Sequence, residues 1–93
     1  MTREETRIFK LLDGYARRSY ECFVAEFDLD KTESRYNVCF RPLGSDVNSS
    51  NRFACKFVTI DRTDVDGIRA GEMLPDAVAD LMNRVLPALK GLK

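Results

Sequence analysis

The feature that most constrains this chain is a change in the spacing of its apolar residues, from about four residues to two and back again. Near the N-terminus, Ile8, Leu12 and Tyr15 recur at helical spacing. Thr2 and Glu5 precede them as a Thr-x-x-Glu capping box, in which each side chain satisfies a free amide at a helix start. The sequence therefore predicts a helix from about Arg3 to Arg17.

Three stretches in the middle of the chain alternate apolar with polar residues, as half-buried strands do. They are Tyr20–Leu29, Arg35–Leu43 and Arg52–Ile60. The residues expected on the buried face are Phe23, Ala25, Phe27 and Leu29 in the first stretch, Tyr36, Val38 and Phe40 in the second, and Phe53, Cys55 and Phe57 in the third. Three such stretches in a row predict an antiparallel meander. Phe27 is expected opposite Tyr36, which would place Asp28 opposite Arg35 across the first hairpin.

The C-terminal third returns to helical spacing after an acidic linker predicted at Asp61–Gly71. Apolar residues from Leu74 to Leu89 mark the buried side of this second helix. Pro75 suits its first turn. Pro87 has no amide hydrogen to donate, so the helix is expected to kink or to stop near Leu86 and resume as a short turn.

The element order is therefore helix, three strands, helix, in a chain of 93 residues. Two apolar helical stripes and one aromatic sheet face predict a two-layer α+β fold in which both helices cover the same face of the sheet. Residues 1–93 are expected to form a single domain, which is the usual size for one hydrophobic core.

Composition narrows the classes of function. Fifteen basic and fifteen acidic residues give no net charge, and the chain contains no histidine. No histidine base, phosphate-binding glycine loop or set of metal ligands occurs, so we expect no enzyme, no metal site and no cofactor. Three widely spaced cysteines, without the even number of a disulfide framework, predict reduced thiols and a cytoplasmic protein. No apolar run approaches the roughly 20 residues of a membrane span, so we expect no membrane insertion, and no small-molecule substrate is evident.

The sheet face away from the helices is the candidate binding surface. Strand alternation predicts a small apolar centre with cations around it, made of Val24, Cys39, Ala54 and Val58 and of Arg35, Arg41, Arg52 and Lys56. An apolar centre with a charged rim is typical of protein contacts. The sequence therefore predicts a small protein-interaction module (an adaptor, inhibitor or regulatory subunit) that binds a protein partner or forms a homodimer, through this face or the edge of the strand at residues 20–29.

Two alternatives remain for this face. The four cations could contact the phosphates of a nucleic acid, although nucleic-acid-binding sheets usually add outward aromatic residues for base stacking. The face could also be merely solvated. The element order matches that of the double-stranded-RNA-binding domain, whose last helix opens on a Lys-Lys-x-Ala-Lys cluster. Here the corresponding segment, 72–76, is acidic, and no membership of that family is inferred.

Overall fold

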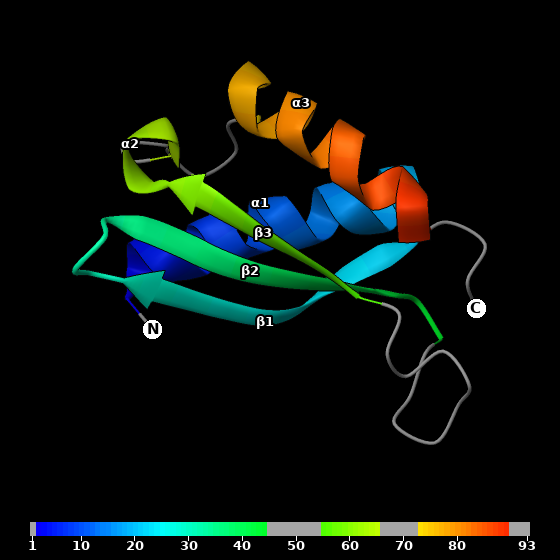
Figure 1. Ribbon diagram of the computed structural model, residues 1–93, viewed down its shortest axis with the longest axis horizontal. Helices are drawn as coiled ribbons and strands as arrows, with labels where there is room; N and C mark the ends of the chain where they lie inside the picture. Colours follow the sequence, from blue (N-terminus) through cyan, green and yellow to red (C-terminus); the bar gives the residue numbers. More distant parts are fainter. Residues whose placement is uncertain (1, 45–54, 66–72, 90–93) are drawn as a thin grey trace.

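The computed structural model describes residues 2–44, 55–65 and 73–89. Along the chain it contains α1 (Arg3–Tyr20), β1 (Cys22–Asp30), β2 (Arg35–Pro42), β3 (Lys56–Asp61), α2 (Arg62–Val65), α3 (Asp76–Val85) and the 3-10 helix η1 (Leu86–Leu89). The three strands form one antiparallel sheet in the order β1-β2-β3, with α1 running behind it (Figure 1). The predicted α+β fold and meander are confirmed.

Helix α1 begins where the capping box predicts. The Thr2 hydroxyl accepts a hydrogen bond from the Glu5 amide at 3.1 Å. The helix continues three residues beyond the predicted Arg17, through Tyr20, and Glu21 then ends it with a left-handed φ of 55°. Gly14 is accommodated inside the helix, and the side that carries Ile8 and Leu12 is fully buried.

The first hairpin pairs two residues away from the predicted register. Phe27 lies opposite Val38, and Asp30, not Asp28, lies opposite Arg35. The Asp30 carboxylate accepts hydrogen bonds from the amides of Thr32 and Glu33 and so stabilises the turn at residues 31–34. A shift of two residues leaves every side chain on its own face, so the hydrophobic pattern alone cannot distinguish the two pairings.

A β-bulge divides β1 into two halves. Val24 lies opposite Phe40 but Glu26 lies opposite Cys39, so Ala25 is an extra residue without a partner. Because one inserted residue reverses the alternation, residues with even numbers face the helices before the bulge and residues with odd numbers do so after it. The prediction is therefore right for Phe27 and Leu29, which pack against the core, and wrong for the half of the strand before the bulge, where Cys22 and Val24 are buried and Ala25 is exposed.

Strand β3 faces the opposite way from the prediction. Val58 and Ile60 are buried against the helices, whereas Phe57 is 71% exposed. Val58 lies opposite Val38 and Ile60 opposite Tyr36, so these two β-branched residues complete the inner face that β2 sets. Residues 52–54 of the predicted strand lie outside the described residues.

The C-terminal elements close the core. The predicted acidic linker contains a four-residue helix, α2, whose Val65 is fully buried. Helix α3 ends at Val85 and the chain continues as η1 across Pro87, which confirms the break expected at the proline. One buried cluster unites the side chains of α1, of α2, α3 and η1, and of one face of the sheet.

Candidate functional site

The candidate site is the sheet face turned away from the buried cluster, called here the outer face. The strand pairings assign its residues: Phe23, Glu26, Asp28 and Asp30 from β1, Arg35, Asn37, Cys39 and Arg41 from β2, and Phe57, Thr59 and Asp61 from β3. The buried residues of the described helices all join the opposite face. Among the described parts of the chain, no helix packs its buried residues against the outer face, although the Arg17 side chain of α1 reaches Phe23 at its edge.

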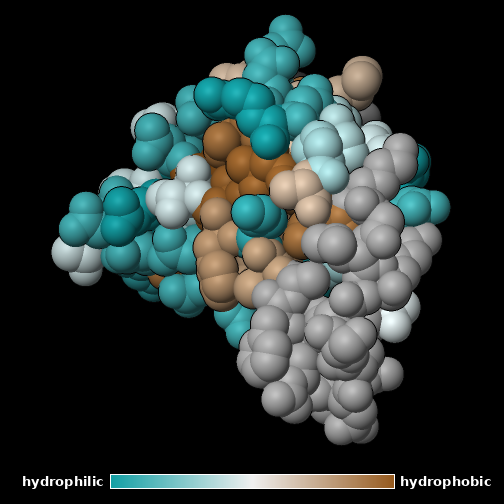
Figure 2. All heavy atoms as spheres, turned by 45° about the vertical axis from the view of Figure 1, so that its right-hand side comes forward, coloured by the Kyte–Doolittle hydropathy of each residue, from teal (hydrophilic) through white to brown (hydrophobic). Residues whose placement is uncertain are grey.

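Phe57 is the apolar centre of the outer face. It lies directly opposite Cys39, which in turn lies opposite Glu26, so these three residues form one row across the sheet. With 71% of its surface exposed, Phe57 is one of two large apolar side chains in the described residues that remain open to water; the other is Met73. Hydrophobic side chains also reach the surface at the end of the molecule where η1 and the start of β3 lie, with hydrophilic side chains around them (Figure 2).

Cys39 lies on the central strand and is only 5% exposed. The pKa of its thiol is raised to about 11, chiefly by burial and in smaller part by the neighbouring Cys55 thiol and Glu26 carboxylate, against an opposite effect of Arg41. The thiol is therefore protonated at neutral pH and is a poor nucleophile. Cys39 contributes shape and apolar surface to the outer face, and its chemistry gives no support to a catalytic role.

Charged residues surround this centre, and carboxylates outnumber cations. Arg35 lies opposite both Asp30 and Asp61 at the hairpin end of the sheet, and its buried Nε makes no hydrogen bond to a described residue. Arg41 lies opposite Phe23 near the other end. Glu26 and Asp28 add two further carboxylates, so the described residues of the outer face comprise four acidic and two basic side chains, an acidic balance where the sequence predicts a cationic one.

The structure separates the predicted site residues into three groups. Cys39, Arg35 and Arg41 lie on the outer face as predicted. The placement of Val24 and Val58 is wrong, because the bulge and the reversed alternation of β3 bury both of them in the core, at 6% and 4% exposure. Lys56 is exposed but lies opposite Phe40, in a row that faces the helices, so its placement is also wrong.

The other two predicted residues, Ala54 and Arg52, lie outside the described residues. Phe57, which sequence reasoning placed in the core, is the residue that it missed. The sequence does contain an indication of the observed orientation. Ile60 and Val58 share the even-numbered face of the strand predicted at residues 52–60, and together they make that face as apolar as the odd-numbered face that carries Phe57.

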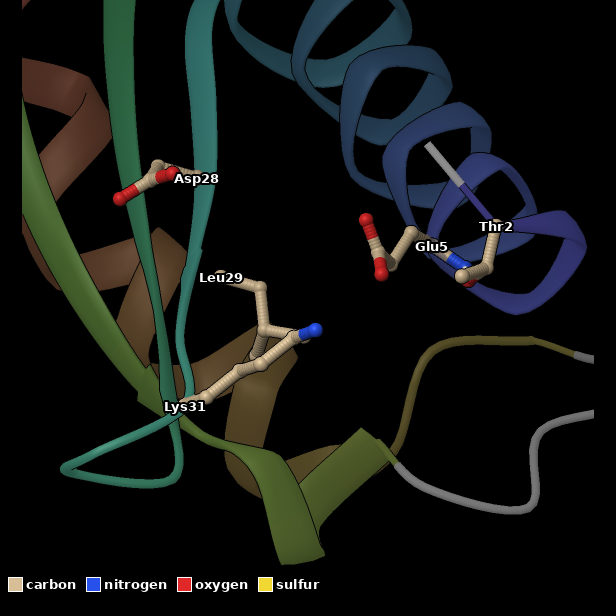
Figure 3. A pocket seen from close by; sticks show the side chains of 5 residues that line it. All are labelled: Thr2, Glu5, Asp28, Leu29 and Lys31. Atoms are coloured by element: carbon tan, nitrogen blue, oxygen red, sulfur yellow. The ribbon is translucent and has the colours of Figure 1, made fainter.

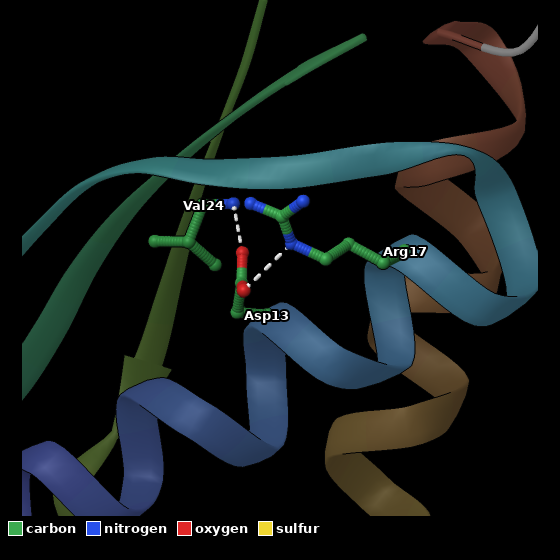
Figure 4. Close-up of polar contacts among 3 residues, drawn as sticks. All are labelled: Asp13, Arg17 and Val24. Atoms are coloured by element: carbon green, nitrogen blue, oxygen red, sulfur yellow. Dashed lines mark hydrogen bonds and ion pairs between the residues drawn. The ribbon is translucent and has the colours of Figure 1, made fainter. Parts of the chain in front are cut away.

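The edge of β1, the second predicted contact, is covered in part by α1. The Asp13 carboxylate accepts the Val24 amide hydrogen at 2.9 Å through one oxygen and the Arg17 Nε hydrogen at 2.8 Å through the other (Figure 4). The Arg17 guanidinium also lies over the Phe23 ring, 5.8 Å from its centroid. The amide at the bulge is therefore already bonded and is closed to an incoming strand.

Two cavities lie away from the outer face's centre. In one, of about 420 Å³, Glu5 and Lys31 point into the space between the start of α1 and the first hairpin (Figure 3). The other, of about 510 Å³, lies between α1 and the start of α3, with Leu11, Tyr15 and Met73 among its lining residues. The residues that line the two cavities are exposed or half-buried, so neither cavity displays a fixed arrangement for a ligand.

Two polar side chains of α1 bond to α3. The hydroxyls of Tyr15 and Tyr20 each donate a hydrogen bond to Asn83 Oδ1 at 2.6 Å. Loss of solvation, together with the neighbouring Tyr15, raises the pKa of Tyr20. This pair of hydrogen bonds fixes the end of α1 against α3 and has a structural purpose.

Within the described residues, no helix combines the length and the apolar character that crossing a membrane requires. Comparison of the chain with protein-family models, with curated proteins and with solved structures finds no match.

Proposed function

We propose that this protein is a small non-catalytic interaction module, an adaptor, inhibitor or regulatory subunit, that binds a partner protein through the outer face. One observation carries the proposal: Phe57, on the edge strand β3, is 71% exposed on the outer face of the sheet. Removing a phenylalanine side chain from water is worth about 1.5–3 kcal/mol. A partner that covers Phe57 gains the larger part of this free energy, because folding leaves 71% of the residue exposed.

The surroundings of Phe57 support a protein partner. A protein interface typically combines an apolar centre with a polar, charged rim. Cys39 packs beside Phe57 but is nearly buried, while Arg35, Arg41 and Glu26 supply rim charges of both signs. Mixed charges favour a partner that carries a complementary pattern over a uniformly charged surface.

A nucleic-acid partner is the second candidate. The exposed ring of Phe57 is the outward aromatic residue that base stacking needs, and Arg41 could contact a phosphate. Against this, the four carboxylates of the outer face would repel a phosphate backbone. We therefore place protein binding first and treat nucleic-acid binding as the competing outcome of the test.

We propose a cytoplasmic location for this interaction. The three cysteines, Cys22, Cys39 and Cys55, are all free, and Cys22 and Cys39 are buried as small apolar residues. Free thiols in this number are typical of a reducing compartment.

Quantitative affinity capture from a lysate of the source cells tests the proposal. The baits are the wild-type protein, Phe57→Ser, and Met73→Ser as the matched control, because Met73 is also an exposed large apolar residue but lies before α3, outside the sheet. We expect a partner that wild type and Met73→Ser retain equally and that Phe57→Ser loses at least tenfold.

Equal capture by all three baits would contradict the proposal. The competing function is tested by fluorescence anisotropy with labelled RNA and DNA at low salt. Micromolar binding that weakens steeply with salt and disappears in Phe57→Ser would replace protein binding with nucleic-acid binding.

A further inference from the structure

Two of the three cysteines lie together at the outer face. Cys39 lies opposite Phe57, and Cys55 precedes Phe57 by two residues, so strand alternation brings Cys55 to the same face, one diagonal step from Cys39. The two thiols are close enough for a side-chain hydrogen bond, and both cysteines are free. The third cysteine, Cys22, is fully buried in the core on the opposite face. The fold therefore brings one pair of thiols together and keeps the third thiol apart.

A disulfide between Cys39 and Cys55 needs only a small movement of the backbone. Diagonal neighbours in an antiparallel sheet have Cα atoms about 7–8 Å apart, whereas most disulfides join Cα atoms about 4.4–6.8 Å apart. The described pairing of β3 with β2 begins at Lys56, so Cys55 lies just before the ladder. The Cys55 backbone can therefore approach Cys39 while every paired residue of β3 keeps its partner.

The two thiols differ in how easily an oxidant reaches them. Cys55 is half-buried, whereas Cys39 is only 5% exposed. The raised pKa of Cys39 further disfavours it as the first nucleophile. A small oxidant in solution therefore reacts first at Cys55. A sulfenic acid formed there condenses with a nearby thiol, and the contact with Cys39 supplies that thiol at high effective concentration.

We propose that Cys39 and Cys55 form a reversible disulfide when the protein meets hydrogen peroxide. The Cys55 sulfur attacks one peroxide oxygen, the O–O bond breaks, and water leaves as Cys55 becomes a sulfenic acid. The Cys39 sulfur then attacks the Cys55 sulfur, the S–O bond breaks, and the hydroxide leaves as water with the proton of Cys39. In total the two thiols lose two electrons and two protons, and one peroxide is reduced to two waters. A dithiol reductant restores both thiols, as expected for the transient disulfides of a reducing compartment.

The disulfide would change the candidate site. It would lie beside Phe57, replace two thiols with one bridge, and fix the start of β3 against β2. The chemistry of the pair goes beyond the proposed function, and only this effect on partner binding rests on it.

Peptide mapping by mass spectrometry tests the disulfide in the wild-type protein. The protein is treated briefly with hydrogen peroxide at pH 7, and the remaining thiols are then blocked in denaturant. Trypsin cleaves after Arg35, Arg52 and Lys56, so residues 36–52 should be found linked to residues 53–56, and a dithiol reductant should separate them. Cys22 should carry the blocking group, and the intact single chain should be lighter by two hydrogen atoms.

Three variants assign the roles of the cysteines. Cys55→Ser should slow the oxidation of Cys39 about tenfold or more, because the peroxide must then reach a nearly buried sulfur. Cys39→Ala should leave Cys55 as a sulfenic acid that dimedone traps. Cys22→Ala is the matched control and should form the disulfide at the wild-type rate.

The wild-type map needs no variant, so the test does not depend on how the variants fold. An oxidised Cys55 beside an unreacted Cys39, a disulfide that includes Cys22, or a bridge between two chains would overturn the proposal. Absence of the disulfide would leave the proposed function intact if capture still depended on Phe57. A mapped disulfide with capture indifferent to Phe57 would leave only the redox pair.

Discussion

Substitution of Asp13 should weaken the attachment of α1 to β1. In the native protein the Asp13 side chain is 20% exposed and serves two donors, the Val24 amide at 2.9 Å and Arg17 Nε at 2.8 Å. Val24 is only 6% exposed, so water has limited access to its amide once the carboxylate is gone. Asp13→Ala therefore leaves a nearly buried donor without an acceptor.

The expected cost follows from these contacts. A buried donor left without an acceptor costs about 1–3 kcal/mol. The lost ion pair adds little, because 51% of the Arg17 side chain is exposed and exposed pairs are worth about 0–1 kcal/mol. Alanine recovers roughly 0.5 kcal/mol through its higher helix propensity. We expect Asp13→Ala to lower the free energy of unfolding by about 1–2 kcal/mol, which corresponds to a fall in Tm of about 4–16 °C for a domain of this size.

Urea denaturation followed by circular dichroism measures this cost, and two variants assign it. Asp13→Asn retains an oxygen for the Val24 amide but loses the charge, so it should cost less than Asp13→Ala. Arg17→Ala removes the ion pair and the contact with Phe23 and should cost at most about 1 kcal/mol. The reasoning is refuted if Asp13→Ala changes the free energy of unfolding by less than about 0.5 kcal/mol, or if Arg17→Ala is equally destabilising.

Four further predictions concern the sheet and the glycines. Phe57→Ser should change the free energy of unfolding by less than about 0.5 kcal/mol, whereas Val58→Ser should cost at least about 2 kcal/mol; comparable urea midpoints would show that the face assignment is wrong. The folded-state pKa of Cys39 is raised to about 11 from 9.0, so its contribution to stability is complete below pH 9 and is lost as the pH rises to 11. The Tm of wild type should therefore fall more over this window than that of Cys39→Ala, and parallel curves would contradict the assignment. Gly14→Ala should raise stability by about 0.5–1 kcal/mol, because the new Cβ meets only the far end of a flexible arginine side chain; calorimetry showing a loss would exclude this. Gly44→Ala should cost about 1–2 kcal/mol, because Gly44 has a φ of +82°, and an unchanged Tm would count against that strain.

Local sequence signals predict much of the fold. The start of α1 follows from Thr2 and Glu5, and the change from α3 to η1 follows from Pro87, because each depends on residues close together in the chain. The order of the strands follows likewise from alternation and short connections. These features need no knowledge of distant contacts.

Tertiary contacts decide the remaining features, and there the sequence misleads. Both faces of the strand predicted at residues 52–60 carry apolar residues, and pairing with Val38 and Tyr36 places Val58 and Ile60 in the core and leaves Phe57 outside. The predicted binding surface is wrong for the same reason, because its exposed apolar residue is Phe57 and not Val58. No local pattern identifies Asp13 as the acceptor for a strand amide eleven residues later.

The bulge at Ala25 also determines how the first hairpin can assemble. In a regular hairpin, sliding one strand by two residues costs little, because every side chain returns to the same face. Here such a slide would move the extra residue relative to β2, so that Val24 would no longer lie opposite Phe40 and Glu26 would no longer lie opposite Cys39. We therefore expect the extra residue at Ala25 to favour this alignment of β1 with β2 over one that is shifted by two residues.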